Sequence, residues 1–185
     1  VHVIDDEEFV RDSIASLLNA ANFDVRTHAS VLAFMEIIDS VTSGCIITDL
    51  KMPGASGIDL LKKLNALKAD IPVIVITGHG DVPLAVEAMK LGAMDFLEKP
   101  FDREALRAHL QKGLALDAEW RRHDAEFNAI DRRIARLNER DLETLQLILA
   151  GTSNKVMAAR LFISERAVEM RRAAIMRKVE VRSLA

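Results

Sequence analysis

Short apolar runs alternate with amphipathic segments through residue 101. The apolar runs predict buried strands, and the clearest is Val73-Ile74-Val75-Ile76, in which every side chain is β-branched. The segments between them repeat apolar residues every three or four positions, which predicts helices. The predicted strands span 1–4, 23–28, 45–48, 72–77 and 93–97, and the predicted helices span 7–21, 31–38, 58–67, 82–91 and a segment that begins near 102.

This alternation of strands and helices predicts an α/β fold with a five-stranded, doubly wound parallel sheet that is covered by helices on both faces. In such sheets the functional crevice lies at the carboxyl ends of the strands. Asp5, Asp6, Asp49, Thr77 and Lys99 each lie at or just past the end of a predicted strand. We therefore expect these side chains to converge at one edge of the sheet.

A long helix is predicted from Asp102 to about Leu137, because this segment contains no proline and a single glycine. Its apolar residues Phe127, Ile130, Ile134 and Leu137 follow a 3-4-3 spacing. The spacing is typical of a short seam with a second chain, and equally of a helix that lies on its own domain. The sequence leaves both interpretations open.

The last part of the chain predicts three short helices, at 139–149, 153–161 and 164–179. Gly151 is suited to end the first of them, and Thr152 or Ser153 to begin the second. Only two residues separate the second helix from the third, which is the pattern of a helix-turn-helix whose second helix reads the major groove. The residues predicted to form its core are Leu161, Phe162, Ile163, Val168 and Ile175.

Charge is distributed unevenly along the chain. From Asp131 onward there are twelve Lys and Arg against seven Asp and Glu, and before it thirteen against twenty-one. An acidic front and a basic tail predict two modules, of which the tail meets a polyanion. A length of 185 residues is too short for a barrel enzyme of roughly 250 residues.

Cysteine and hydropathy narrow the class of protein further. The single cysteine, Cys45, excludes a disulfide framework and is expected to be buried on a central strand. No stretch reaches the ~18 apolar residues of a membrane helix. Because no secretory signal is visible either, we expect a cytoplasmic protein that does not contact a membrane.

The acidic residues at the strand ends predict phosphoryl chemistry. Three neighbouring carboxylates repel one another unless a cation neutralises them, and oxygen ligands without His or Cys indicate Mg²⁺. With Lys99 and the Thr77 hydroxyl nearby, Asp49 is a candidate nucleophile that takes up a phosphoryl group. Taken singly, Asp6 could cap the first helix and Asp49 could begin a turn. Their joint placement favours the chemical interpretation.

The front part, residues 1–112, resembles the receiver domain of two-component response regulators. The resemblance lies in the order and spacing of Asp5-Asp6, Asp49-Leu50-Lys51-Met52-Pro53 with Gly57, Thr77-Gly78 and Lys99-Pro100. The run from Thr77-Gly78-His79-Gly80-Asp81-Val82-Pro83 to Glu98-Lys99-Pro100-Phe101 is similar to the FixJ-like branch. A flavodoxin-like sheet is the fold that this resemblance implies.

The resemblance also implies a role for each residue of the acidic group. Asp49 would accept a phosphoryl group from a sensor histidine kinase. Asp6, Asp49 and the backbone carbonyl of Lys51 would hold Mg²⁺, with Asp5 acting through water. Lys99 would pair with the phosphate.

A conformational switch is implied in the same way. Thr77 would turn toward the phosphate and Phe96 would move inward, after which the surface from Val82 to Phe101 repacks and binds a second copy of the chain. Many members of the family have Tyr in place of Phe96. Because phenylalanine has no hydroxyl group, only packing can report the inward state here.

The tail, residues 133–185, resembles the LuxR-type DNA-binding domain, with residues 113–132 as a helical linker. The resemblance rests on Leu137-Asn138-Glu139-Arg140-Asp141, Gly151-Thr152-Ser153-Asn154-Lys155, Ile163-Ser164-Glu165-Arg166-Ala167-Val168-Glu169 and Ile175-Met176-Arg177-Lys178. Ala167 and Arg171 depart from the usual Thr and His. The candidate DNA contacts are Asn154, Lys155, Ser164, Arg166, Glu169, Met170, Arg171 and Arg172, of which Glu169 and Met170 would face base edges.

Together these features predict a transcriptional response regulator rather than an enzyme. Phosphorylation of Asp49 would promote a homodimer that binds double-stranded promoter DNA, and RNA polymerase is a further candidate partner. One alternative is a dimerising scaffold without DNA binding. The other is a phosphohydrolase with Asp49 as nucleophile, although such enzymes usually have a second Asp where this chain has Lys51.

Overall fold

The computed structural model describes residues 1–78 and 81–181. His79 and Gly80, which belong to the run from Thr77 to Pro83, lie outside the described residues. So do residues 182–185, at the end of the predicted DNA-binding domain. Among the helices of the described part, none is long and apolar enough to cross a membrane.

Contacts within the chain divide it into two compact units, Val1–Arg122 and His123–Ala185. The division falls inside one long helix, α5 (Arg103–Ile134), so the segment predicted as a linker, 113–132, is helical throughout.

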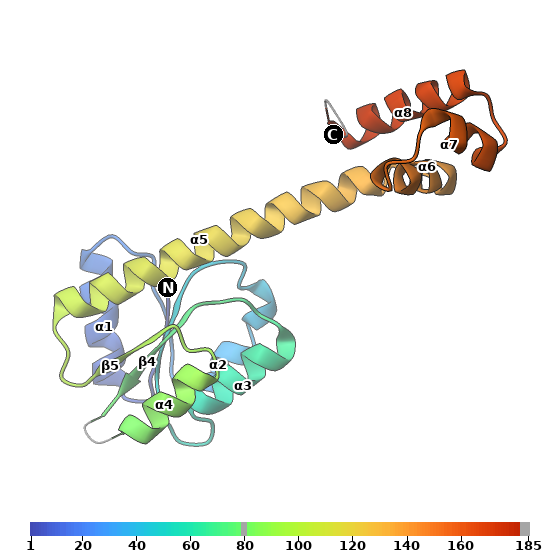
Figure 1. Cartoon of the computed structure of the whole chain (residues 1–185). Coiled ribbons are helices and arrows are strands. Elements are labelled where there is room, and N and C mark those ends of the chain that lie inside the picture. Colours follow the sequence, from blue (N-terminus) through green and yellow to red (C-terminus); the bar gives the residue numbers. More distant parts are fainter. Residues whose placement is uncertain (79–80, 182–185) are drawn as a thin grey trace. The chain divides into compact units, whose positions relative to one another are not determined.

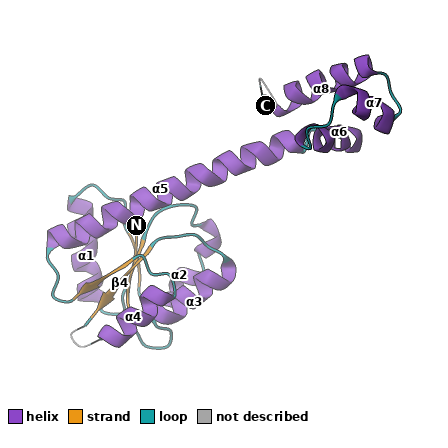
Figure 2. Ribbon diagram, viewed as in Figure 1, coloured by secondary structure: helices purple, strands orange, loops and turns teal. Residues whose placement is uncertain are grey.

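The first unit is built on a parallel sheet in the order β2-β1-β3-β4-β5, which confirms the predicted fold class. Figures 1 and 2 show helices on both sides of this sheet. Its strands are β1 (His2–Ile4), β2 (Arg26–His28), β3 (Ile46–Asp49), β4 (Val73–Thr77) and β5 (Asp95–Glu98). Its helices are α1 (Glu8–Ala20), α2 (Val31–Met35), α3 (Gly57–Leu67), α4 (Val82–Lys90) and the first part of α5.

Helices cover both faces of this sheet because successive strand residues point to opposite sides. On β3, Ile46 packs in a core cluster with residues of α2, α3 and α4, whereas Ile47 packs in a second cluster with residues of α1 and α5. The central strands are buried on both sides, as the continuous apolar run of β4 indicates.

Several predicted elements differ in extent from the observed ones, and two of these differences have a local cause. The predicted strand 23–28 is reduced to β2, because its neighbour β1 offers only three paired residues. The predicted helix 31–38 ends at Met35, with Glu36 as its C-cap residue. The backbone leaves the helical region at Ile37, with φ −111° and ψ 1°, and a short 3₁₀ turn follows, η1 (Ile38–Ser40). Neither difference moves the carboxyl ends of the strands.

Gly113 allows α5 to approach the sheet closely at Cys45, whose thiol is buried as expected and has its pKa raised to about 12 by that burial. A Cβ atom at Gly113 would lie 2.7 Å from the Cys45 sulfur. We expect Gly113→Ala to lower the free energy of unfolding by about 1–3 kcal/mol. In the double variant with Cys45→Ala that sulfur is gone, so urea unfolding should show much of the loss recovered. If the double variant instead loses the sum of the unfolding free energies that Gly113→Ala and Cys45→Ala lose singly, the added methyl group clashes with an atom other than the Cys45 sulfur.

The second unit contains the three predicted helices, α6 (Glu139–Leu149), α7 (Asn154–Leu161) and α8 (Glu165–Val179). Asn138, Ser153 and Ser164 cap them, each accepting a hydrogen bond from the backbone N–H three residues on. Val168 and Ile175 are buried, and Leu161 and Ile163 pack against the core, as predicted.

The prediction that Phe162 belongs to this core is wrong, because its side chain is 94% exposed. Phe162 ends α7 as its C-cap residue, with φ 53° and ψ 43° in the left-handed region. That conformation costs a residue with a Cβ atom about 1–2 kcal/mol. The chain turns from α7 into α8 between Leu161 and Glu165, and Phe162 lies in this turn with its side chain outside the core.

Candidate functional site

The carboxyl ends of the parallel strands bring Asp5, Asp49 and Lys99 together. Asp49 is the last residue of β3, Asp5 follows β1 and Lys99 follows β5. The Lys99 ammonium nitrogen lies 2.9 Å from Asp49 Oδ1 and 3.3 Å from Asp5 Oδ2. Both acidic residues are buried, with 8% of Asp49 and 1% of Asp5 exposed. One ammonium group therefore bridges two buried carboxylates.

Burial and charge act in opposite directions in this group. Burial raises the pKa of Asp5, the Asp49 charge adds to the rise, and the Glu7 backbone N–H and Lys99 oppose it. Burial alone would lower the pKa of Lys99, but the hydrogen bond to Asp49 and the charges of Asp49 and Asp5 outweigh it, so the pKa of Lys99 is raised. Lys99 thus places a lasting positive charge beside the Asp49 carboxylate at neutral pH.

The loop after β3 is held at Lys51, both through its backbone and through its side chain. The Lys51 backbone N–H donates to Asp49 Oδ2 at 2.9 Å, and its ammonium forms an ion pair with Asp81, the residue before α4. Asp49 Oδ2 therefore accepts a hydrogen bond within the turn after β3, and Asp49 Oδ1 faces Lys99. Asp81 was not predicted as a site residue, because the sequence alone does not distinguish it from an acidic residue on a solvated loop.

The other predicted residues lie near this group, but within the described part of the chain no hydrogen bond or ion pair joins their side chains to it. Asp6 is exposed and does not cap α1, whose N-cap position is held by Glu7. Thr77, the last residue of β4, donates its hydroxyl hydrogen bond to the Gly78 carbonyl at 3.0 Å. Phe96 is 46% exposed.

The predicted Mg²⁺ site therefore stays a prediction. Among the described residues, no three His, Cys, Asp or Glu side chains form a group that could hold a metal ion. Its all-oxygen donor set is nevertheless of the kind that Mg²⁺ prefers, and Asp5 and Asp49 already lie within reach of one cation, the Lys99 ammonium.

Gly57 allows α3 to begin directly against the end of β3. A Cβ atom at this position would lie 2.6 Å from the Asp49 carbonyl oxygen and 3.2 Å from the Leu50 Cα. We expect Gly57→Ala to displace Asp49, to lower the free energy of unfolding by about 1–3 kcal/mol and to slow phosphorylation by acetyl phosphate. Urea unfolding and intact mass measure the two effects.

Gly151→Ala is the matched control for this prediction. Gly151 lies in the second unit with a positive φ of 70°, and no atom of the described residues would lie within 4 Å of a methyl group added there. Its replacement should destabilise that unit through backbone strain without changing phosphorylation. Equal slowing by both variants would mean that the effect of Gly57→Ala is not local to Asp49.

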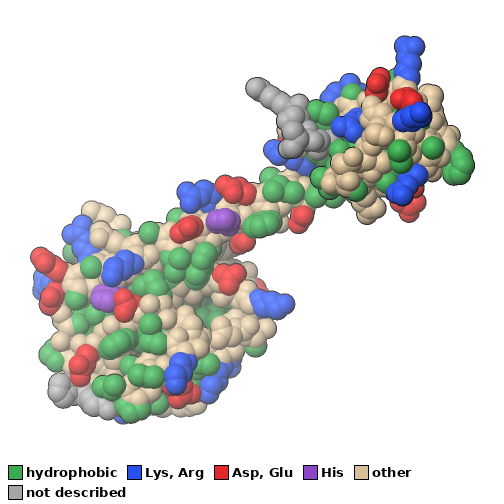
Figure 3. All heavy atoms as spheres, in the orientation of Figure 1, with side chains coloured by type: hydrophobic (Ala, Val, Ile, Leu, Met, Phe, Trp, Pro, Cys, Tyr) green, Lys and Arg blue, Asp and Glu red, His purple; other side chains and the backbone are tan. Residues whose placement is uncertain are grey.

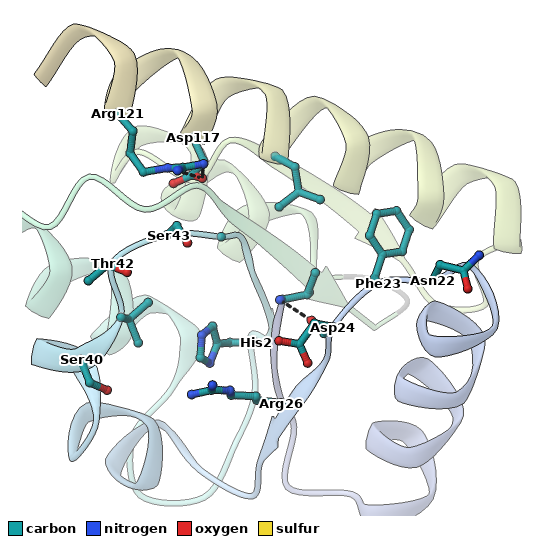
Figure 4. Close-up of a pocket in the computed structure, with 14 residues that line it drawn as sticks. His2, Asn22, Phe23, Asp24, Arg26, Ser40, Thr42, Ser43, Asp117 and Arg121 are labelled. Carbon is teal, nitrogen blue, oxygen red and sulfur yellow. Dashed lines mark hydrogen bonds and ion pairs between the residues drawn. The ribbon is translucent and has the colours of Figure 1, made fainter. Parts of the chain in front are cut away.

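A separate cavity of about 440 Å³ lies at the opposite, amino-terminal end of the sheet. Its walls come from the starts of β1 and β2, the loop 40–44 and α5. Figure 4 shows Asp117 and Arg121 of α5 pointing toward each other, where an ion pair of 2.8 Å joins them. None of the predicted site residues lines this cavity, so it has no share in the chemistry predicted at the carboxyl ends.

The residues predicted to contact DNA lie on α7 and α8 or at the start of α8. Those exposed are Lys155, Ser164, Arg166, Glu169 and Met170, and those half-buried are Asn154, Arg171 and Arg172. Arg172 reaches from α8 toward α7, with Nη1 3.5 Å from the Asn154 side-chain oxygen. Most of the set is therefore available to a partner.

Comparison with known families and structures agrees with this architecture. Residues 1–111 match the response regulator receiver domain, and residues 135–185 match the bacterial regulatory proteins of the luxR family. The response regulator StyR has a solved structure that superposes with a TM-score of 0.91 at 40% identity, covering 99% of this chain and 92% of that one. Full-length FixJ from B. japonicum superposes with a TM-score of 0.63 at 41% identity, covering 99% and 90%.

Curated relatives match over the whole chain. It is 49% identical over 184 residues to the transcriptional regulatory protein FixJ of Azorhizobium caulinodans, covering 100% of this chain and 87% of that protein. It is 46% identical to FixJ of Rhizobium meliloti, with coverage of 100% and 90%. The chain therefore belongs to the response regulators that join a receiver domain to a LuxR-type DNA-binding domain, and among them to the FixJ-like transcriptional regulators.

Proposed function

We propose that phosphorylation of Asp49 by a sensor histidine kinase switches this regulator to a dimer that binds promoter DNA. The observation that supports this most directly is the Lys99 ammonium, 2.9 Å from Asp49 and 3.3 Å from Asp5. A fixed positive charge beside a carboxylate nucleophile stabilises the negative charge of a phosphoryl group during transfer.

In the proposed transfer, an Asp49 oxygen bonds to phosphorus while the bond from phosphorus to the kinase histidine nitrogen breaks, and the freed imidazole takes a proton from water. Lys51 holds the carboxylate in one orientation through Oδ2, so Oδ1 faces Lys99, which then pairs with the phosphate. Asp6, Asp49 and the Lys51 carbonyl would hold Mg²⁺, with Asp5 acting through water. When bound, the ion would supply positive charge to offset that of the phosphoryl oxygens.

Thr77 and Phe96 would carry the signal to the surface. Phosphorylation adds about −1.5 to −2 charges and strong acceptor oxygens. The Thr77 hydroxyl would leave the Gly78 carbonyl and donate to them, and Phe96 would pack inward. The adjoining surface of α4 and β5 carries exposed hydrophobic side chains, which Figure 3 shows gathered on the first unit. They are Val82, Val86, Met89 and Phe96. A second copy of the chain would cover this surface.

On DNA, α8 would lie in the major groove as the second helix of a helix-turn-helix. Glu169 and Met170 would read base edges, accepting from cytosine N4 and packing on a thymine methyl group. The residues that would contact phosphates are Asn154, Lys155, Ser164, Arg166, Arg171 and Arg172. RNA polymerase stays a candidate partner of the DNA-bound dimer.

Selection of DNA by the whole chain tests the proposal. The protein is incubated with a random-sequence duplex library, with and without acetyl phosphate and Mg²⁺, and the retained duplexes are sequenced. We expect the phosphorylated chain to select a two-fold symmetric sequence and to bind it about 5- to 150-fold more tightly than the unphosphorylated chain.

Other outcomes would favour the alternatives. A chain that takes up phosphate but retains no duplex under either condition would be a scaffold. Continuous release of phosphate from small phosphate esters would favour a phosphohydrolase. Against the latter stands Lys51, whose side chain pairs with Asp81 and supplies no carboxyl group as general acid.

A further inference from the structure

The turn between α7 and α8 carries an exposed aromatic side chain on strained backbone. Phe162 is the most exposed large hydrophobic side chain of the described residues, and its φ of 53° lies where glycine is preferred. The turn between α6 and α7 also has a residue with positive φ, and there it is a glycine, Gly151 at φ 70°. Phe162 therefore adds nothing to the core and strains the backbone, which points to a contact outside the fold.

The position of Phe162 favours DNA as that contact. It lies two residues before Ser164, the N-cap of α8. Because the first residues of the second helix enter the major groove, the turn before them lies at the edge of the groove. Two arginines flank Phe162 in the chain, Arg160 at the end of α7 and Arg166 at the start of α8. Helix α7 has no acidic residue, and Glu165 is the one acidic residue between the two arginines. This setting suits a polyanion.

We propose that Phe162 contacts the DNA duplex at the edge of the major groove, packing its ring on deoxyribose carbons and on the C5-methyl group of a thymine. The inference rests on the proposed DNA-binding function. An apolar contact neutralises no phosphate, so it adds affinity without changing the salt dependence of binding. It also creates a preference for thymine at one position, since that methyl group is the apolar group that bases present in the major groove.

The test uses Phe162→Gly in the whole, phosphorylated chain, with the duplex that the unaltered protein selects as the probe. We expect affinity to fall about 10-fold and the preference for thymine to weaken, with the slope of log K against log salt unchanged. Because glycine relieves the strain, the thermal midpoint of the second unit should rise. Phe162→Leu, which keeps part of the apolar surface, should bind with intermediate affinity.

Two variants serve as controls. Lys68 ends α3 in the first unit with the same φ of 53°, so Lys68→Gly should raise the thermal midpoint of that unit and leave DNA binding unchanged. Arg166→Ala should weaken binding and lower the salt slope by about 1, as expected for loss of a phosphate contact.

Several results would overturn the inference. The first is unchanged affinity in Phe162→Gly together with a raised midpoint. The second is a lowered salt slope in that variant, which would mean that phosphate contacts were lost instead. The third is tighter DNA binding by unphosphorylated Phe162→Gly, which would place the ring in an inhibitory contact within the protein. If the unaltered chain selects no duplex at all, the proposed DNA-binding function is wrong. That result differs from the three above, because each of them requires an unaltered chain that binds DNA.

Discussion

Asp49→Asn is expected to slow phosphorylation by acetyl phosphate on the order of 10³-fold or more. The amide lacks the negative charge of the nucleophile, yet its oxygen can still accept the Lys51 N–H, so the turn after β3 should persist. Intact mass measures the result. The unaltered chain should gain the mass of one phosphoryl group in the presence of Mg²⁺, and the variant should gain none. An equal gain in both would place the acceptor at another residue.

Asp117→Asn is the matched control for this experiment. Asp117 is also a buried carboxylate of the first unit, but it lies on α5 and lines the cavity at the amino-terminal end of the sheet. Its replacement should leave phosphorylation unchanged. Loss of the adduct in both variants would show that removal of any buried carboxylate disturbs the receiver, rather than that Asp49 is the acceptor.

Lys99→Gln is expected to slow phosphorylation about 10²-fold and to lower the free energy of unfolding at neutral pH by about 1–3 kcal/mol. The first effect follows because no positive charge remains beside the transferring phosphoryl group. The second follows because Asp5 and Asp49 keep their burial and their mutual repulsion but lose the ammonium between them.

The pH dependence of stability distinguishes this electrostatic effect from a loss of packing. Burial raises the pKa of Asp5 in the folded state. A carboxyl group with a raised folded pKa contributes stability while it is protonated, below its unfolded pKa of about 3.9, and that contribution is lost as pH rises through the folded pKa. Lys99 opposes the rise in the unaltered chain. Without it, stability should fall more steeply with rising pH.

Urea unfolding at a series of pH values from about 4 to 7 measures this slope. The additional slope of Lys99→Gln should be smaller in the double variant with Asp5→Asn, because the neutral amide at position 5 does not titrate. Parallel pH profiles for Lys99→Gln and the unaltered chain would mean that Lys99 stabilises the fold through packing alone.

The strand and helix order of the first unit could be predicted because its signals are local. The β-branched run of β4 can be buried only as a central strand, and the carboxylates that follow the apolar runs mark where β1 and β3 end. The three helices of the second unit were predictable for the same reason, since Ser153 and Ser164 act as caps through hydrogen bonds to residues three positions away.

The sequence by itself therefore determined the order of elements, the edge of the sheet at which the acidic residues gather and the family. Only the tertiary structure decided that Lys99 joins Asp5 to Asp49, that Gly57 lies against the Asp49 carbonyl, and that Phe162 stands outside the core. The physical reason is that propensity and periodicity depend on near neighbours in the chain. A bridging charge, a close backbone approach or a left-handed turn depends instead on how segments distant in sequence pack.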